Sequence, residues 1–266
     1  MQFCSRSQFG SGSGARSAPN KSLKFGTAKP LRGFCGPLAQ PLYAKRWTQV
    51  TTDFVGAEHE FHSKEFALGW AERFVPTPER LRLFELIFTQ LKEVIPSDGR
   101  IIELGMGPGY LANYLLERMP NVSYCGIDFS LPMFEIAQER LQRHSLRVIY
   151  TQADLVEEAW EESVTKPVHA IVSTWALHDL GSPKNINIVY ERSYSALNGG
   201  GILINGDFVK PIGAVQEFEG GRFYVADHLE LLGNVGFLNP HCLSLFEEEI
   251  ENPTPAQNYA CIRAVK

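Results

Sequence analysis

The sequence lacks three features that would place it in other classes of protein. Its five cysteines are odd in number, scattered along the chain and without a C-x-x-C pair. They therefore predict neither a disulfide framework nor a zinc site, and they suit a reducing compartment. No apolar run approaches the roughly 18 to 20 residues of a membrane-spanning helix, so we expect a soluble protein without a membrane span. The histidines show no metal-ligand spacing, and no metal site is expected.

Acidic residues are absent from residues 1–52, which hold eight Lys or Arg. Residues 53–266 hold the other 17 basic residues and all 30 acidic ones, a formal charge of −13. We interpret 1–52 as a basic extension and 53–266 as the globular domain. The Ser, Gly, Arg and Pro content of residues 1–46 fits either a disordered extension or an organelle transit peptide, which leaves the cytoplasm and an organelle matrix or stroma open as locations. The acidic domain argues against nucleic acid as a partner.

The rest of the chain predicts one α/β domain. Helical spacing of apolar residues predicts helices over 59–74 and from Pro78 to about Ile95, which make a helical segment (53–98) ahead of a core at 99–266. Short apolar runs at 100–104, 122–127, 147–151, 168–174 and 201–206 are separated by helical stretches at 110–119, 131–144 and 184–197. This alternation predicts a doubly wound parallel sheet with helices on both faces. Two last strands, near 241–246 and 258–264, follow a helix at 227–235 and should pair antiparallel, because their connection is too short for a crossover helix.

A glycine-rich turn follows the first predicted strand, with glycines at 105, 107 and 109. The first strand-to-helix turn of a doubly wound fold is where nucleotides bind, and glycine lets the backbone approach a ligand closely. In the dinucleotide fingerprint G-x-G-x-x-G the third glycine would stand at position 110, which is Tyr110. The turn therefore indicates a nucleotide site of another kind, with a tight turn that binds no ligand as the alternative.

Two acids follow the next two strands. Asp128 stands 21 residues after Gly107, where a carboxylate can accept both hydroxyls of a ribose. Its alternative role is that of an acid at a helix N-terminus. Asp154 follows the third strand at the same sheet edge, where it can accept the amino group of adenine or serve as a solvated loop acid.

Together these motifs resemble the class I S-adenosylmethionine-dependent methyltransferases. The matching segments are ELGMGPG at 103–109, GIDFS at 126–130, QADL at 152–155, STWALHDL at 173–180 and LNGGGILINGD at 197–207. The resemblance covers roughly residues 57–266. It implies a Rossmann-like, doubly wound, seven-stranded sheet in the order 3-2-1-4-5-7-6, with the last strand antiparallel, and S-adenosylmethionine as the cofactor.

The resemblance also implies roles for individual residues. The glycine turn would line the methionyl part of the cofactor, Asp128 would hold the ribose and Asp154 the adenine. Met106, at a position that is often Cys or Thr in relatives, should be tolerated because mainly backbone faces the ligand there. The cofactor-binding candidates are Glu103, Gly105, Met106, Gly107, Gly109, Asp128, Phe129, Met133, Asp154, Leu155, Ser173 and Trp175.

The candidates for chemistry and acceptor binding follow the fourth and fifth strands. His178 is the candidate base or substrate hydrogen-bond partner, with Asp179 as its orienting partner, and a helix-start or packing histidine is the alternative. Asp207 and Phe208 are expected to contact the acceptor. The aromatic stripe within 59–74 either packs against the domain or closes over the site as a lid, and in the second case His62 and Trp70 would face the acceptor.

These observations predict a methyltransferase that acts on a small hydrophobic or aromatic acceptor. Only residues 209–225 lie between the fifth strand and the next helix, which leaves no inserted domain to hold a macromolecule. Three alternatives stay open. They are an NAD-linked oxidoreductase, which Tyr110 disfavours, a cofactor-binding partner subunit without turnover, and a methyltransferase acting on protein or RNA.

Overall fold

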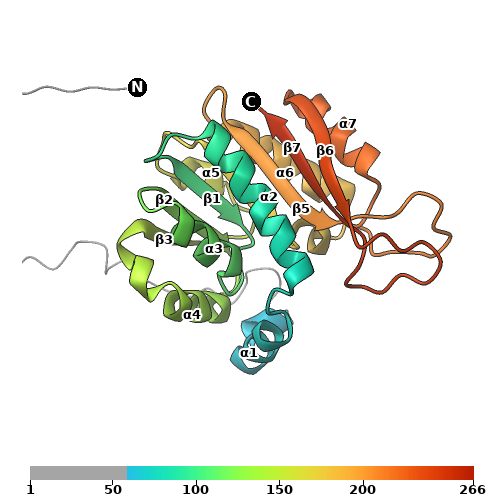
Figure 1. The fold of residues 1–266 in the computed structure, drawn as a ribbon, viewed down its shortest axis with the longest axis horizontal. Helices are drawn as coiled ribbons and strands as arrows, with labels where there is room; N and C mark the ends of the chain where they lie inside the picture. The colour runs from blue at the N-terminus through green and yellow to red at the C-terminus, as the bar shows by residue number, and fades with distance from the viewer. Residues whose placement is uncertain (1–58) are drawn as a thin grey trace, which may run out of the picture. The chain divides into compact units, whose positions relative to one another are not determined.

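Residues 59–266 are described by the computed structural model of the chain, and they form a seven-stranded sheet with helices on both faces (Figure 1). The strand order is β3-β2-β1-β4-β5-β7-β6, which confirms the predicted order. The basic extension predicted for residues 1–52 lies outside the described residues, and so do both readings of residues 1–46.

Five parallel strands bring their carboxyl ends to one edge of the sheet. The seven strands of the sheet are β1 (Arg100–Leu104), β2 (Ser123–Asp128), β3 (Val148–Gln152), β4 (Ala170–Thr174), β5 (Ile202–Phe208), β6 (Leu238–Phe246) and β7 (Tyr259–Val265), and the first five are the parallel ones. Neighbours among β1 to β5 are parallel, whereas β7 is antiparallel to both β5 and β6. The order reverses between β1 and β4, and ligands of doubly wound sheets bind at that kind of switch point.

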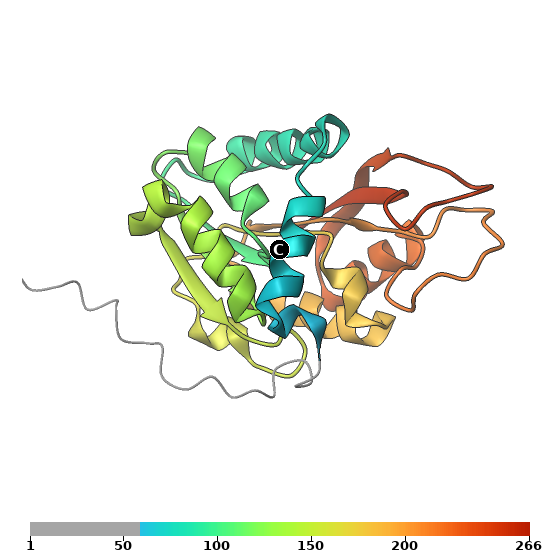
Figure 2. The ribbon, with the colours of Figure 1, turned by 90° about the horizontal axis from the view of Figure 1, so that it is seen from below.

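Each face of the sheet carries its own layer of helices (Figures 1 and 2). One layer holds α2 (Pro78–Val94), α3 (Tyr110–Arg118) and α4 (Leu131–Arg140), and the other holds α5 (Trp160–Ser163), α6 (Pro183–Ala196) and α7 (Val225–Val235). Residues 59–266 also contain three short 3₁₀ helices, η2 (Glu60–His62), η3 (Gln142–Arg147) and η4 (Leu177–Leu180). Within residues 59–266 no helix is both long enough and apolar enough to cross a bilayer.

The predicted helix over 59–74 is wrong in its continuity. The segment divides into η2 and α1 (Lys64–Arg73), because Ser63 between them has an extended backbone and its Oγ accepts a hydrogen bond from the Phe66 N–H. Serine is favoured at this capping position, where it satisfies an N–H that has no partner within the helix. The helix predicted to 144 likewise ends earlier, at Arg140, and continues as η3.

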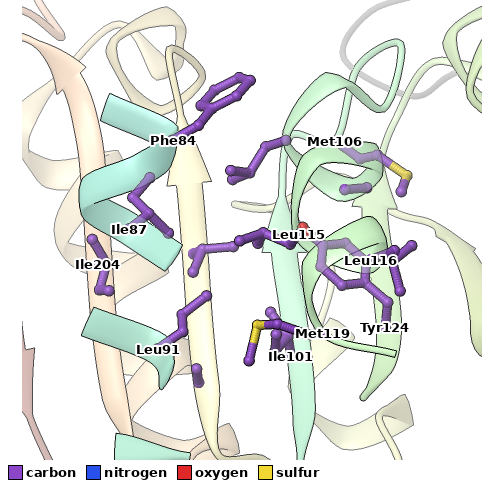
Figure 3. Packing of buried hydrophobic residues seen from close by; sticks show 14 of the residues in the cluster. Phe84, Ile87, Leu91, Ile101, Met106, Leu115, Leu116, Met119, Tyr124 and Ile204 are labelled. Atoms are coloured by element: carbon purple, nitrogen blue, oxygen red, sulfur yellow. The ribbon is translucent and has the colours of Figure 1, made fainter. Parts of the chain in front are cut away.

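Side chains of each strand alternate between the two layers of the core. Ile101 and Ile204 belong to the layer of α2 and α3, whereas Ile102 and Leu203 belong to that of α6 and α7. Figure 3 shows the first layer, in which Phe84, Ile87 and Leu91 of α2 face side chains of α3 across β1 and β4; each of these three is at most 2% exposed. Burying a side chain of this kind contributes about 1.5–3 kcal/mol, which explains why the strands are apolar on both faces.

Two long connections lie side by side beyond the end of β5 (Figures 1 and 2). Arg222, in the segment between β5 and α7, is 3% exposed and donates hydrogen bonds to the carbonyl oxygens of Pro255 (3.3 Å) and Gln257 in the segment between β6 and β7. Its Nε also donates to the Val209 carbonyl at 3.3 Å. These contacts join both connections and the end of β5 into one wall, which we call the Arg222 clamp.

Candidate active site

A cavity of about 550 Å³ opens at the carboxyl ends of the parallel strands. Its lining comes from the turns that follow β1, β2, β3, β4 and β5, from η2, α1 and α2, and from the two connections of the Arg222 clamp. Concave sites of this size at a switch point are where small ligands and cofactors bind in α/β proteins. Most of the residues named from the sequence meet here.

The glycine turn after β1 forms one side of the cavity. Gly105 and Gly107 have φ angles of +64° and +51°, which residues other than glycine rarely adopt. A Cβ on Gly105 would also overlap the side chain of Ala176. Gly107 N–H donates to Asp128 Oδ2 at 2.7 Å, which fixes the turn against β2. The Met106 side chain is 2% exposed and packs over Gly126, so it fills the core while its backbone stays at the turn.

Asp128 and Glu103 are two buried acids at the base of the cavity. Besides the Gly107 N–H, Asp128 accepts the Ser130 N–H at 2.9 Å, and burial raises the pKa of Asp128 to about 6 although these backbone N–H groups oppose the rise. Glu103 accepts the Tyr124 hydroxyl at 2.7 Å. Burial raises the pKa of Glu103 to about 8, opposed by that hydrogen bond and reinforced by the charge of Asp128. Two acids that resist ionisation in one cavity indicate a site that gains from a cationic or hydroxyl-bearing ligand.

Asp154 lies on the cavity beside Leu155. Its Oδ1 accepts the backbone N–H groups of Val156 (2.8 Å) and Glu157 (3.0 Å), so this oxygen closes a turn, as a loop acid would. Its other oxygen forms no hydrogen bond with the described part of the chain. The structure therefore shows the loop-acid role, and the role toward adenine stays a prediction.

The remaining cofactor candidates divide into two groups. Phe129, Met133 and Trp175 line the cavity with the residues above. Gly109 and Ser173 do not line it. Gly109 is the residue before α3 and lies against Ala137 of α4, and Ser173 is 1% exposed and donates its Oγ–H to the Leu104 carbonyl at 2.9 Å. Both therefore hold strands and helices together beneath the site.

His178 of η4 is paired with a buried carboxylate. Its Nδ1 lies 2.8 Å from Asp207 Oδ1, and its backbone N–H donates to Asp207 Oδ2 at 2.9 Å. The Asp207 side chain is 2% exposed. Burial lowers the pKa of His178, but the charge of Asp207 and the hydrogen bond to it, with smaller contributions from Asp179 and Glu219, outweigh burial and raise that pKa to about 8. This arrangement fixes the ring and makes it a base stronger than an ordinary histidine.

The orienting partner of His178 differs from the one named from the sequence. Asp207 holds Nδ1, whereas Asp179 Oδ1 lies 3.2 Å from Nε2, on the other side of the ring. The Asp179 side chain is 62% exposed, so it can turn away and leave Nε2 to a ligand. Asp207, expected to contact the acceptor, instead lies behind His178 and does not line the cavity.

Of the other residues predicted to contact the acceptor, two line the cavity and one does not. Phe208 lines it and packs edge-on against the His178 ring, with centroids 4.8 Å apart. Trp70 of α1 also lines it and stacks on Phe74. His62 is absent from the lining, and its ring packs against Phe129 at 5.5 Å.

Several lining residues of the helical segment are absent from the candidates named from the sequence, among them Phe74, Arg80 and Phe84. The Arg80 guanidinium lies over the rings of Phe74 (5.4 Å) and Trp175 (5.1 Å). Within residues 59–266 no other Lys or Arg lines the cavity, and Arg80 has no carboxylate partner there. The sequence does contain a signal for Arg80, because a cation in the first turn of a helix is unfavourable to the helix dipole. Such a cation suggests a role in binding rather than in helix stability.

Trp175 stands in a strained position at the end of β4. Its φ is +49°, which is uncommon for a bulky residue, and its N–H donates to the Gly206 carbonyl at 2.9 Å. The indole packs against Phe84 and Tyr259, with centroids 5.9 and 5.4 Å away. Strain of this kind, of order 1–3 kcal/mol, persists where the surroundings hold it, often at functional sites.

Comparison with known proteins gives a consistent family for this fold and site. Residues 101–201 match the family model described as "Methyltransferase domain". A release factor glutamine methyltransferase of Nitratidesulfovibrio vulgaris is 27% identical over 119 residues, covering 44% of this chain and 39% of that protein. A trans-aconitate 2-methyltransferase of Rhodopseudomonas palustris is 40% identical over 63 residues, 24% of each chain.

The solved structures agree at the level of the fold. Human N-acetylserotonin methyltransferase in complex with S-adenosylmethionine superposes with a TM-score of 0.53 at 15% identity, covering 77% of this chain and 57% of that one. The chain spans less than half the length of each of these two curated relatives. The motifs, the strand order and the family model together show that this chain has a methyltransferase domain of the class I S-adenosylmethionine-dependent family.

Proposed function

We propose that this protein transfers a methyl group from S-adenosylmethionine to an ionisable hydroxyl of a small aromatic acceptor. The observation that carries the proposal is the His178–Asp207 pair, which borders the same cavity as the glycine turn and Asp128. A base of raised pKa fixed beside a nucleotide-type site suits removal of a proton from an acceptor.

The residues present fit the cofactor. Asp128 accepts one hydrogen bond on each oxygen, and an ionised carboxylate has about four acceptor positions, so it can also accept ribose hydroxyls. Phe129 and Leu155 would flank the adenine and the glycine turn the methionyl part, where Arg80 is the cation available for a carboxylate. S-adenosylmethionine supplies a methyl group on a cationic sulfur, which the Asp128 carboxylate favours above pH 6, where it is mainly ionised.

His178 would act on the acceptor through Nε2. Asp207 holds Nδ1–H, so the neutral ring presents its lone pair on Nε2, and Asp179 must turn outward as the acceptor hydroxyl takes its place. Nε2 would take the proton while the oxygen forms its bond to the methyl carbon and the bond from that carbon to sulfur breaks, which would leave the neutral thioether S-adenosylhomocysteine. The ring then carries a positive charge, which Asp207 stabilises. Asp207 is thus a positioning residue in this proposal, and general-base catalysis typically contributes 10²–10⁴-fold.

Aromatic side chains support a flat acceptor. Phe74, Phe84, Trp175 and Phe208 supply rings on the side of the cavity near His178. Rings favour offset or edge contacts with another aromatic ring, each worth about 0.5–1.5 kcal/mol beyond the area buried. Because no inserted domain borders the cavity within residues 59–266, its lining suits a small molecule better than a folded macromolecule.

The helical segment is suited to act as a cover. Ser130 Oγ–H donates to the Phe61 carbonyl (2.6 Å), Tyr110 Oη–H donates to the Ala71 carbonyl (2.7 Å), and Lys64 pairs with Glu135 (2.6 Å). These contacts tie η2 and α1 to the turn after β2 and to α3 and α4, where Trp70 borders the cavity. A closed cover would exclude water from the reacting groups.

Thermal unfolding with two ligands tests the cofactor. S-adenosylhomocysteine at 100 times its Kd should stabilise the full chain by about 2.7 kcal/mol, because it binds the folded state only. NAD at the same concentration should give no shift. Stabilisation by NAD without stabilisation by S-adenosylhomocysteine would reverse the proposal in favour of an oxidoreductase.

Methyl transfer into a cell extract tests the acceptor class. With methyl-labelled S-adenosylmethionine, label should enter the small-molecule fraction after separation by size. Label in the protein or RNA fraction would replace the small acceptor by a macromolecular one. No label in any fraction, with binding of S-adenosylhomocysteine intact, would favour a partner subunit without turnover.

Cofactor affinity should fall at acidic pH. The pKa of Asp128 is raised to about 6, so its carboxylate ionises as pH rises through 6 and is lost as pH falls below it. If the ionised form alone accepts the ribose hydroxyls, the Kd for S-adenosylhomocysteine should weaken by about tenfold per pH unit below 6. Calorimetric titration between pH 5 and 8 measures this. Asp128→Asn should bind weakly at every pH, and a wild-type Kd that is flat from pH 5 to 7 would contradict the assignment.

A further inference from the structure

The connection between β5 and α7 makes a tight turn that lies against η4. The Arg222 N–H donates to the Glu219 carbonyl at 2.9 Å and closes this turn. Gly220 and Gly221 are its two central residues, and we call residues 219–222 the Gly220 turn. Neither glycine has a positive φ, so the backbone conformation itself would accept other residues. The reason for two successive glycines therefore lies in what surrounds them.

The surroundings leave no space for a side chain. An ideally placed Cβ on Gly221 would overlap the His178 carbonyl oxygen and would lie 2.6 Å from its carbonyl carbon and 3.0 Å from its Cα. A Cβ on Gly220 would overlap the carbonyl oxygen of Gly181, the residue that follows η4. Carbon atoms in ordinary contact are about 3.5–4.0 Å apart, and backbone atoms cannot turn aside as a flexible side chain does. The Gly220 turn thus meets η4 backbone to backbone.

Asp207 holds the same residue of η4 through other atoms. The His178 N–H and Nδ1 lie 2.9 and 2.8 Å from the two carboxylate oxygens of Asp207. Phe208 packs edge-on against the ring, with centroids 4.8 Å apart. The Gly220 turn meets the carbonyl group instead. The N–H, the ring and the carbonyl group of His178 are therefore each in contact with a different part of the chain.

The Gly220 turn is held more firmly than η4. The Arg222 side chain is 1% exposed, and the Arg222 clamp ties it to three carbonyl groups. Its guanidinium also lies over the Phe208 ring at 4.9 Å. Within η4 the N–H groups of Asp179 and Gly181 lie 3.3 and 3.4 Å from the carbonyl oxygens that they reach, beyond the usual length of such bonds. A side chain added to the turn should therefore displace η4 rather than the turn.

We propose that the Gly220 turn supports η4 at its carbonyl groups and thereby holds the His178 ring on Asp207. Gly220 and Gly221 are positioning residues, because only a backbone without side chains can approach η4 this closely. The same turn carries Glu219, which lines the cavity, so the base and this part of the cavity wall keep one relative position. The inference rests on the proposed function only in the use made of His178, since the contact is a property of the free protein.

A histidine NMR titration of the full chain tests the inference. The ¹⁵N-labelled protein is titrated from pH 5 to 9.5 without cofactor or acceptor, with the His178 signal assigned through His178→Asn. Burial lowers the pKa of His178, but the charge of Asp207 and the hydrogen bond to it, with smaller contributions from Asp179 and Glu219, raise it to about 8. Gly221→Ala should lower the midpoint by about one unit, tenfold in the protonation constant, because the displaced ring loses Asp207.

A matched series separates this role from a general loss of structure. Gly220→Ala should lower the midpoint by about half a unit, roughly threefold, because its Cβ meets only the end of η4. This position is exposed, so Gly220→Ala decides the test if Gly221→Ala does not fold. Gly199→Ala makes the same change where no heavy atom lies within 4 Å of the Cβ, and the midpoint should stay that of the wild type. His169, whose Nδ1 accepts an N–H of β1 at 3.0 Å at the other edge of the sheet, should keep its signal in every folded variant.

A double variant shows whether the glycines act through Asp207. In Asp207→Asn the carboxylate charge is absent, so the added glycine-to-alanine change should shift the His178 midpoint much less than it does in the wild type. An equal shift in both backgrounds would overturn the inference, and so would wild-type midpoints in the folded glycine variants. Expected midpoints without methyl transfer would contradict the proposed function alone.

Discussion

Asp128→Ala is expected to weaken S-adenosylhomocysteine binding by about 100-fold or more. The carboxylate would accept two ribose hydroxyls, and hydrogen bonds to a charged group contribute about 1.5–3 kcal/mol each. The variant also frees the N–H groups of Gly107 and Ser130, which Asp128 now holds, so the glycine turn loses its attachment to β2. Isothermal titration calorimetry at pH 7.5 measures the change directly.

Two further variants make that result interpretable. Asp98→Ala removes an exposed acid in the turn before β1, at the opposite edge of the sheet, and should leave the Kd within twofold. Asp128→Asn keeps the shape of the side chain and removes its charge, but its amide nitrogen cannot accept the Gly107 or Ser130 N–H that a carboxylate oxygen now accepts. Comparing the thermal stability of the free Asp128→Asn and Asp128→Ala proteins therefore separates damage to the turn from loss of ligand contacts. A wild-type Kd in Asp128→Ala would remove the ribose assignment.

His178→Ala is expected to reduce kcat by 10²–10⁴-fold while the Kd for S-adenosylhomocysteine changes less than twofold. The acceptor fraction identified in the extract experiment serves as substrate. The pKa of His178 is raised to about 8, so the reactive neutral ring forms only as pH rises through 8, and wild-type kcat/KM should rise over the same range. Asp207→Asn removes the charge that outweighs burial, so the midpoint of this pH profile should move to lower pH as turnover falls.

The control for this pair is His241→Ala. His241 is exposed on the edge strand β6, where its Nδ1 lies 2.7 Å from the Asn239 carbonyl oxygen, far along the sheet from the glycine turn. Turnover and pH profile should match the wild type. If His178→Ala retained wild-type turnover, proximity of acceptor and cofactor would suffice for the reaction, and the ring would have a packing role.

The sequence predicted the sheet well because its evidence is local. Apolar runs bounded by turn residues located β1 at 100–104 without error and the other strands within a few residues, and the short last connection gave the antiparallel pair. Ser63 was the local signal that was overlooked, since it divides the predicted first helix.

The site was harder to predict because its pairs come from distant parts of the chain. Asp179 adjoins His178 in sequence and was named as its partner, yet Asp207, 29 residues away, holds Nδ1. A 3₁₀ turn sends adjacent side chains in different directions, and only the register of β4 and β5 brings Asp207 beneath the ring. Arg80 and Phe84 were missed for a similar reason, since the place of α2 over the sheet is a tertiary property.

The Arg222 clamp holds together two connections that are separate in the sequence and that border the same side of the cavity. Two connections share one guanidinium, that of Arg222, whose carbonyl partners on the second connection are 33 and 35 residues away. Both connections reach the cavity, through Glu219 on one and through Pro255 and Ala256 on the other. The contacts that would hold the cofactor come instead from β1 to β3 and the turns after them. A change of length or composition in either connection is therefore transmitted to its partner while the nucleotide half keeps its shape. Under the proposed function, both connections together would therefore set acceptor preference, independently of the strands that would hold the cofactor.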